Sequence, residues 1–165
     1  MSVECGKVGR LWTTSLQDQA LLGQNGGVES VIIVCGSCGH TLTSALRQLD
    51  VIPKPLRAQP EDERYLPTIP DGAWASDPDP IGWRGQLPTS TLGCLVINPE
   101  DAIGVLSSDD PMRNSGCCGH DGLDGPNLLC GGCRSEVATL RDDCWTRLEV
   151  RFEPSAVAIG ASRSL

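Results

Sequence analysis

Two short cysteine pairs, separated by more than half of the chain, constrain the fold more than any other feature. The first pair is Cys35-Gly-Ser-Cys38 and the second is Cys130-Gly-Gly-Cys133. The C-x-x-C spacing allows two thiolates from one tight turn to bind a single metal ion, and two such turns supply the four ligands of a structural zinc site. The sequence therefore predicts one Zn²⁺ bound by Cys35, Cys38, Cys130 and Cys133.

The long interval between the pairs is compatible with a shared site. It covers residues 39–129, which is 91 residues. Compared with the roughly 10–20 residues between the halves of a compact four-cysteine module, the extra loop closure costs about 1.5–2 kcal/mol. A structural zinc ion contributes on the order of 10–16 kcal/mol at neutral pH. The metal term is much larger, so distant turns can share one ion.

The strands expected around the cysteine pairs support this interpretation. The first pair follows the β-branched run 28–34, and the second follows Leu128-Leu129 and precedes an expected strand at 137–140. In this setting the two turns resemble the cysteine turns of zinc ribbons, over about 35 residues in all. The resemblance implies a small β structure built around a closed zinc site.

The C-terminal part carries a second resemblance. The stretch GCCGHDGLDGPN, the second cysteine pair and Asp143-Cys144-Trp145 are similar to the C-terminal signature of short proteins from GC-rich bacteria, over residues 93–157. The preference for arginine over lysine agrees with a bacterial origin. This resemblance suggests a family and implies no activity.

Other arrangements of the cysteines stay open. A local metal site could combine Cys130 and Cys133 with Cys144 and either Cys118 or His120. Either pair could instead serve thiol–disulfide exchange, although the chain lacks the alternating βαβ pattern of thioredoxin-like proteins. The thiols could also be small buried apolar groups.

A second group of possible ligands or reactive thiols comprises Cys117, Cys118, His120 and Cys144. An ion with an open coordination position there would make the protein a zinc-dependent, hydrolase-type enzyme, with Asp121 or Glu136 as the proton acceptor. The sequence has no G-x-S-x-G, H-E-x-x-H or P-loop motif. Four thiolates would close the first site to catalysis, so we favour an interaction module and keep the enzyme as the alternative.

Composition predicts a small, mainly β domain with a modest core. The 165 residues include 19 Gly and 12 Pro but one Phe and one Tyr. The runs 28–34 and 92–97 predict buried strands, and polar–apolar alternation over 144–153 predicts a half-buried strand. The segment 40–49 fits either a helix or a strand, so an α+β fold is the alternative. Asn98-Pro99 predicts the cap of a brief helix.

The domain organisation follows from the glycines and prolines. We expect a flexible arm over residues 1–27 and a single zinc-containing domain over residues 28–160. Residues 53–88 hold eight of the twelve prolines, and we expect an irregular, exposed insertion there, without central strands or long helices. Exposed tryptophans would be anchors for a partner, the candidates being Trp74, Trp83 and Trp145.

Net charge and hydropathy indicate which class of partner and which cellular compartment the sequence favours. The net charge of −8 favours a protein partner, in a regulatory or assembly role, over nucleic acid, although Arg147 and Arg151 could contact phosphate. An acidic mimic of nucleic acid is a third option. No apolar run approaches the roughly 18 residues of a membrane span or the core of a secretory signal. The sequence therefore predicts a cytoplasmic protein that has no membrane association and keeps its thiols reduced.

Overall fold

The computed structural model describes residues 29–56, 65–78 and 92–162. It is mainly β, with 37% strand and 5% helix, which confirms the predicted fold class. The helical residues form two single turns of 3-10 helix, Pro99–Asp101 and Pro111–Arg113. In the described part of the chain, no helix has the length and apolar character that crossing a bilayer requires. The expected arm over residues 1–27 and Trp83 lie outside the described residues.

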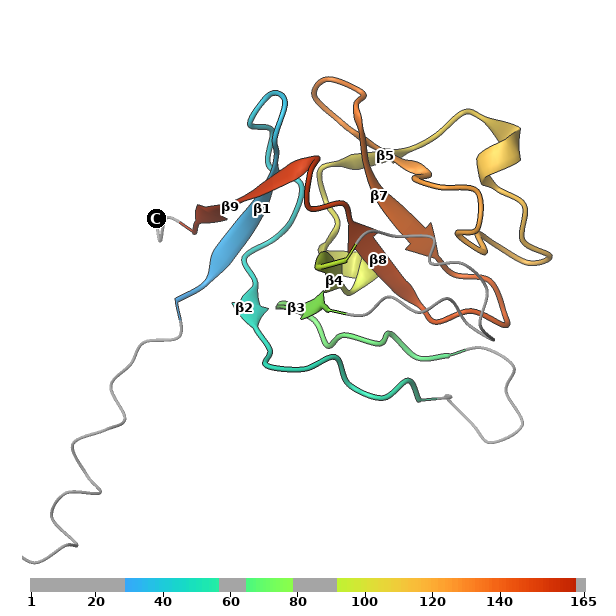
Figure 1. Ribbon diagram of the computed structural model, residues 1–165, viewed down its shortest axis with the longest axis horizontal. Coiled ribbons are helices and arrows are strands. Elements are labelled where there is room, and N and C mark those ends of the chain that lie inside the picture. Colours follow the sequence, from blue (N-terminus) through green and yellow to red (C-terminus); the bar gives the residue numbers. More distant parts are fainter. Residues whose placement is uncertain (1–28, 57–64, 79–91, 163–165) are drawn as a thin grey trace, which may run out of the picture.

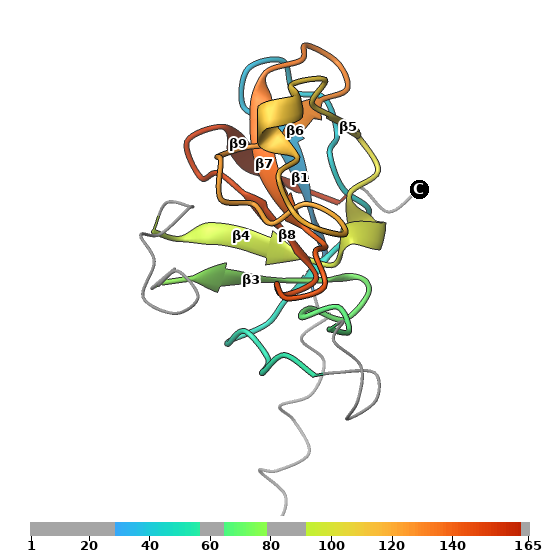
Figure 2. The same ribbon diagram turned by 90° about the vertical axis from the view of Figure 1, so that its right-hand side faces the viewer.

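The strands form two sheets (Figures 1 and 2). In the small sheet, β1 (Val31–Cys35) pairs antiparallel with β9 (Val157–Ala161), so the two ends of the described chain lie side by side. The large sheet has seven strands in the spatial order β2 (Arg47–Gln48), β3 (Ala73–Asp77), β4 (Cys94–Ile97), β8 (Glu149–Phe152), β7 (Glu136–Arg141), β6 (Leu128–Cys130) and β5 (Val105–Ser107). Among the strands of the described residues, only β2 and β3 pair in parallel.

The main core joins the small sheet to one face of the large sheet. Ile33 of β1 packs with Ile97 of β4, Val137 of β7 and Phe152 of β8, all fully buried. Alternate residues of β4 point to the opposite face, where Cys94 and Val96 pack with Ile69 in a second cluster. Because β4 is buried on both faces, its sequence is continuously apolar rather than alternating, as the run 92–97 indicates.

Two shorter predictions concern the segments beside the first cysteine pair and β4. The segment 40–49 contains no helix; it forms isolated bridges at Thr41 and Leu46, bends at residues 43–44, and is a strand only at β2, and Leu42 and Leu46 are buried. The helix expected at Asn98-Pro99 is present as the single 3-10 turn Pro99–Asp101, and the Asn98 side chain accepts a hydrogen bond from the backbone N–H of Glu100.

The proline-rich segment contains a strand that the sequence analysis excluded. Ala73–Asp77 forms β3, which lies between β2 and β4 inside the large sheet. The prediction failed because it averaged the prolines over residues 53–88, whereas Ala73–Asp77 is itself free of proline and can donate every ladder hydrogen bond. Trp74 is buried in the main core, so it is no exposed anchor, and Trp145 is partly buried.

The last predicted strand is shorter and more deeply buried than the alternation suggests. It is β8, Glu149–Phe152, and all four residues are buried. Val150 and Phe152 face the main core, while Arg151 is 2% exposed and Glu149 0%. The prediction that Arg151 faces solvent and could contact phosphate is therefore wrong.

An ion cluster explains how β8 accommodates buried charge. The Arg151 guanidinium donates to Glu149 Oε1 at 2.8 Å and to Asp77 Oδ2 of β3. Burial lowers the pKa of Arg151, but the charges of Glu149 and Cys94 and the hydrogen bond to Asp77 raise it above its ordinary value. Buried charges persist in proteins when they are paired and hydrogen-bonded in this way.

Candidate metal centres

The two C-x-x-C turns, here called knuckles, have the same backbone construction. In the first, the N–H of Gly39 donates to the carbonyl of Cys35, and the N–H of Cys35 donates to the carbonyl of His40, both at 2.8 Å. In the second, Arg134 N–H donates to the Cys130 carbonyl and Cys130 N–H to the Ser135 carbonyl, also at 2.8 Å. The residue after each pair has positive φ, 72° at Gly39 and 60° at Arg134.

The fold places one knuckle at the end of a strand in each sheet and brings their sulfurs together. Cys35 is the last residue of β1 and Cys130 the last of β6. Gly104 links the two turns, because its N–H donates to the Leu42 carbonyl and its carbonyl accepts from the N–H of Gly131. A Cβ at position 104 would collide with the backbone of Thr41 and Leu42. A glycine is therefore required where the knuckles approach each other.

The four sulfurs have the spacing of a tetrahedral thiolate site. Ligand atoms of Cys35, Cys38, Cys130 and Cys133 all lie within 4.8 Å of one another. The Cys35–Cys133 and Cys38–Cys130 Sγ–Sγ distances are 3.7 and 3.6 Å. In a tetrahedral Zn–thiolate site with bonds of about 2.3 Å, the edge between two sulfurs is about 3.8 Å. The predicted set of four residues thus comes together and could hold a metal ion.

Burial and hydrogen bonding differ among the four thiols. Cys35 and Cys130 are buried, whereas Cys38 and Cys133 are exposed. Hydrogen bonds to the Ser135 side chain and backbone and to Cys38 lower the pKa of Cys133 to about 6. A backbone hydrogen bond at His40 lowers the pKa of Cys38, but hydrogen bonds to the other three thiols and desolvation raise it to about 12. One thiol of the set is therefore ready to bind metal as a thiolate at neutral pH.

A second cluster combines Cys117, Cys118 and Cys144 with Asp143, and their ligand atoms also lie within 4.8 Å of one another. Cys117 Sγ is 3.3 Å from the sulfurs of both Cys118 and Cys144. The Asp143 carboxylate points its Oδ1 at Cys117 and Cys144, at 3.4 Å from each sulfur. This cluster could also hold a metal ion.

His120 does not belong to the second cluster, contrary to the ligand set considered from the sequence. Its Nδ1 lies 2.9 Å from Asp142 Oδ1, and its backbone N–H donates to the same oxygen. The fourth possible ligand of this cluster is Asp143 and not His120. The sequence analysis missed Asp143, although its position directly before Cys144, in a run of two aspartates, was a usable signal.

The proposed proton acceptors of the enzyme alternative have other partners. Asp121 accepts hydrogen bonds from the Leu123 N–H and the Ser115 hydroxyl. Glu136 forms an ion pair with Arg113 at 2.8 Å. Neither is part of the second cluster. The local site that would mix Cys130 and Cys133 with Cys144 is also not formed, because these cysteines belong to two separate clusters.

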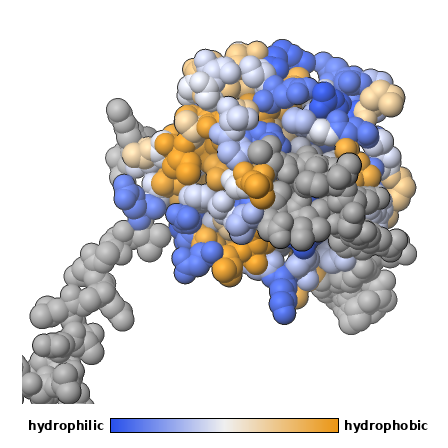
Figure 3. All heavy atoms as spheres, in the orientation of Figure 1, coloured by the Kyte–Doolittle hydropathy of each residue, from blue (hydrophilic) through white to orange (hydrophobic). Residues whose placement is uncertain are grey.

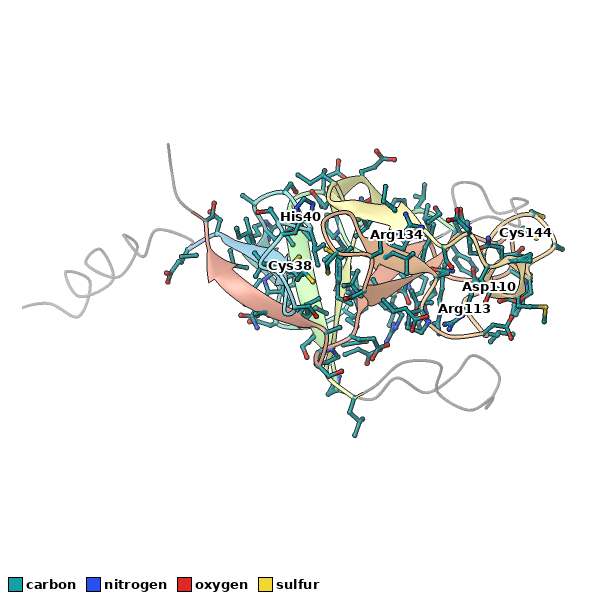
Figure 4. The ribbon with its side chains drawn as sticks, turned by 90° about the horizontal axis from the view of Figure 1, so that it is seen from above. Cys38, His40, Asp110, Arg113, Arg134 and Cys144 are labelled. Atoms are coloured by element: carbon teal, nitrogen blue, oxygen red, sulfur yellow. The ribbon has the colours of Figure 1, made fainter. Side chains whose placement is uncertain are left out.

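The eight cysteines within the described residues are free thiols. The two clusters occupy different parts of the molecule, since Cys38 and Cys144 lie well apart in Figure 4. No protein-family model, curated protein or solved structure matches this chain. The functional argument therefore depends on the geometry of the clusters.

Proposed function

We propose that this protein is a structural-zinc interaction module. One Zn²⁺ is bound by Cys35, Cys38, Cys130 and Cys133 and joins the two sheets. The domain stabilised in this way binds a protein partner in a regulatory or assembly role. The observation that carries the proposal is the tetrahedral spacing of four sulfurs from two turns, each of which follows a strand of a different sheet. Cytoplasmic localisation, where thiols stay reduced, is part of the proposal.

The donor set favours zinc and a structural role. Four thiolates in tetrahedral geometry suit Zn²⁺ or iron and disfavour hard ions such as Mg²⁺ and Ca²⁺. When all four positions are filled by protein sulfur, no position remains for a water or substrate, so the ion supplies folding free energy rather than catalysis. That role fits a domain whose small sheet has two strands and little independent stability.

Metal analysis tests this part of the proposal. Elemental analysis of the purified full chain should find zinc, and Cys35→Ser or Cys130→Ser should each remove one equivalent and lower the melting temperature. The matched control is Cys5→Ser, which changes a cysteine outside the four. Iron in place of zinc, or as much zinc in both knuckle variants as in wild type, would contradict the proposal.

Surface properties support a protein partner. The acidic balance of −8 opposes binding to polyanions. Apolar side chains gather over β1 and β9 on the face shown in Figure 3. In the antiparallel register Ile32 lies opposite Gly160 and Val34 opposite Ala158, so Ile32 and Val34 share one face of this strand pair, and both are partly exposed. Contiguous apolar surface of this kind is typical of interaction sites.

Cross-linking in the native host, followed by recovery of the tagged chain, tests this second part. We expect a specific cross-linked protein that is lost with Ile32→Asp and retained with Leu106→Asp, a matched change of an exposed apolar residue in β5. Equal recovery with both variants would refute the assignment of this face.

A further inference from the structure

The cluster of Cys117, Cys118, Cys144 and Asp143 has no role in the proposed structural zinc site. We propose that it is a second metal site, which binds one Zn²⁺ through three thiolates and one carboxylate and exchanges that ion with solvent more readily than the four-thiolate site does. The proposal is independent of the function proposed above and rests on the geometry of a different part of the chain.

Hydrogen bonds from two backbone segments hold the ligands in place. Asp143 is 2% exposed, and its Oδ2 accepts from the N–H groups of Cys118 at 2.8 Å and Gly119 at 3.1 Å. This pair of bonds fixes the turn that carries Cys117 and Cys118 against the segment that carries Cys144. Asp143 Oδ1 remains directed at the sulfurs.

The neighbouring Asp142 holds the other end of the same turn. Its Oδ1 accepts from the His120 N–H at 2.6 Å, and its own N–H donates to the His120 carbonyl at 3.0 Å. Two successive aspartates therefore hold the backbone of residues 118–120 through hydrogen bonds. Such pre-organisation lowers the entropy cost of assembling ligands around an ion.

Two glycines make this close approach possible. A Cβ at Gly116 would collide with the Gly119 carbonyl and the Asp143 carboxylate, and a Cβ at Gly119 would collide with Asp142. The sequence Gly-Cys-Cys-Gly thus permits the turn to fold onto Asp142 and Asp143. The constraint at both glycines indicates a constructed site rather than an incidental meeting of surface thiols.

The sulfur–oxygen distances fit a tetrahedral zinc site of mixed donors, and the sulfurs are close enough to move apart onto one ion. With Zn–S bonds of about 2.3 Å and Zn–O bonds of about 2.1 Å, a sulfur–oxygen edge is about 3.6 Å. The observed sulfur–oxygen distances are 3.4 Å. The sulfur–sulfur distances of 3.3 Å are shorter than the about 3.8 Å of a filled thiolate site and much longer than the about 2.05 Å of a disulfide bond.

The donors and their exposure predict faster exchange at this site. The second site has a carboxylate where the first site has a fourth thiolate. Thiolate is the softer ligand, and structural zinc sites commonly use four of them. Cys117 and Cys118 are both exposed, so a chelator can reach two adjacent ligands from one side. In the first site, one cysteine of each knuckle is buried. We therefore expect the second ion to leave first.

Zinc reconstitution under reducing conditions tests the proposal on the full chain. Wild type and the control Cys5→Ser should each retain two zinc equivalents after gel filtration, while Cys117→Ser/Cys144→Ser should retain one. Asp143→Asn should weaken one of the two equivalents by about 10–100-fold, the usual effect of losing a carboxylate that orients or ligates a metal. A single equivalent in wild type, or two in the double-serine variant, would overturn the proposal.

A measurement on wild type alone removes any dependence on how the variants fold. Alkylation mapped by mass spectrometry should show Cys117, Cys118 and Cys144 protected by two equivalents of Zn²⁺ and exposed first on adding a chelator. Cys38 and Cys133 should become reactive later. Equal reactivity of Cys117, Cys118 and Cys144 with and without zinc, or a disulfide among them in the reduced, zinc-loaded protein, would refute the second site. Protection of Cys38 and Cys133 in the same map reports separately on the first site.

Discussion

Removal of the Arg151 charge should be among the most damaging single substitutions in this protein. Arg151→Met keeps most of the side-chain volume but removes the cation that contacts both Asp77 and Glu149, and Glu149 then keeps only the longer contact to Arg141, at 3.7 Å. Glu149 is fully buried, and Asp77 lies in β3, on the far side of β4 from β8, with a side chain that is 12% exposed. The expected cost follows from these burial values and from the short contacts that Arg151 makes with both carboxylates.

The magnitude can be set by comparison with other buried ion pairs. Removing one partner of such a pair costs about 3–5 kcal/mol, because the remaining charge is desolvated and unpaired. For a domain of this size, each kcal/mol lowers the melting temperature by about 2–4 °C. Arg151→Met should therefore lower the melting temperature by about 6–20 °C at saturating zinc.

Thermal and urea unfolding, followed by circular dichroism, would measure this loss. Arg47→Met on the exposed edge strand β2 is the matched control and should cost less than about 1 kcal/mol. Adding Glu149→Gln and Asp77→Asn to Arg151→Met should restore much of the lost stability, because the uncompensated charges are then gone. If Arg151→Met and Arg47→Met cost the same, the ion cluster does not stabilise the sheet.

Three further predictions concern the first metal site. In the Cys117→Ser/Cys144→Ser background, each tenfold rise in free zinc should add about 1.4 kcal/mol of stability and raise the melting temperature by about 3–6 °C; a melting temperature independent of zinc would contradict the linkage. Because Cys133 has a pKa of about 6, zinc binding should release more protons at about pH 5 than at about pH 7.5, so affinity should fall more steeply in acid. Calorimetry in buffers of different ionisation enthalpy measures this, and an equal release at both pH values would refute it. Gly104→Ala should cost at least about 1–3 kcal/mol through overpacking and weaken zinc binding, measured by denaturation and chelator competition; wild-type stability and affinity would contradict the collision with Thr41 and Leu42.

Local patterns predicted the elements around the first cluster well. The β-branched run before Cys35, the apolar run 92–97 and the cap at Asn98 each produce the expected structure, because each depends on neighbours in the sequence. The meeting of the two knuckles was also predictable. Identical C-x-x-C spacing at two positions is a strong chemical signal, and loop closure costs little compared with metal binding.

Features that depend on distant neighbours were not predictable from the pattern. Alternation along β8 shows correctly that Glu149 and Arg151 share a face, but it does not show that this face is covered and that Asp77 lies across from them. The weak run Val157–Ala161, with its Gly160, forms β9 only because β1 offers an antiparallel edge. Asp143 joins the second cluster through backbone hydrogen bonds that no spacing rule encodes.

X-ray absorption at the zinc edge tests the central claim most directly. The Cys117→Ser/Cys144→Ser variant, loaded with one equivalent of Zn²⁺, isolates the site formed by the two knuckles. We predict a single shell of four sulfur atoms at about 2.3 Å from zinc. A shell that contains nitrogen or oxygen, or a protein in which the knuckle cysteines are joined as disulfides and bind no zinc, would contradict the account.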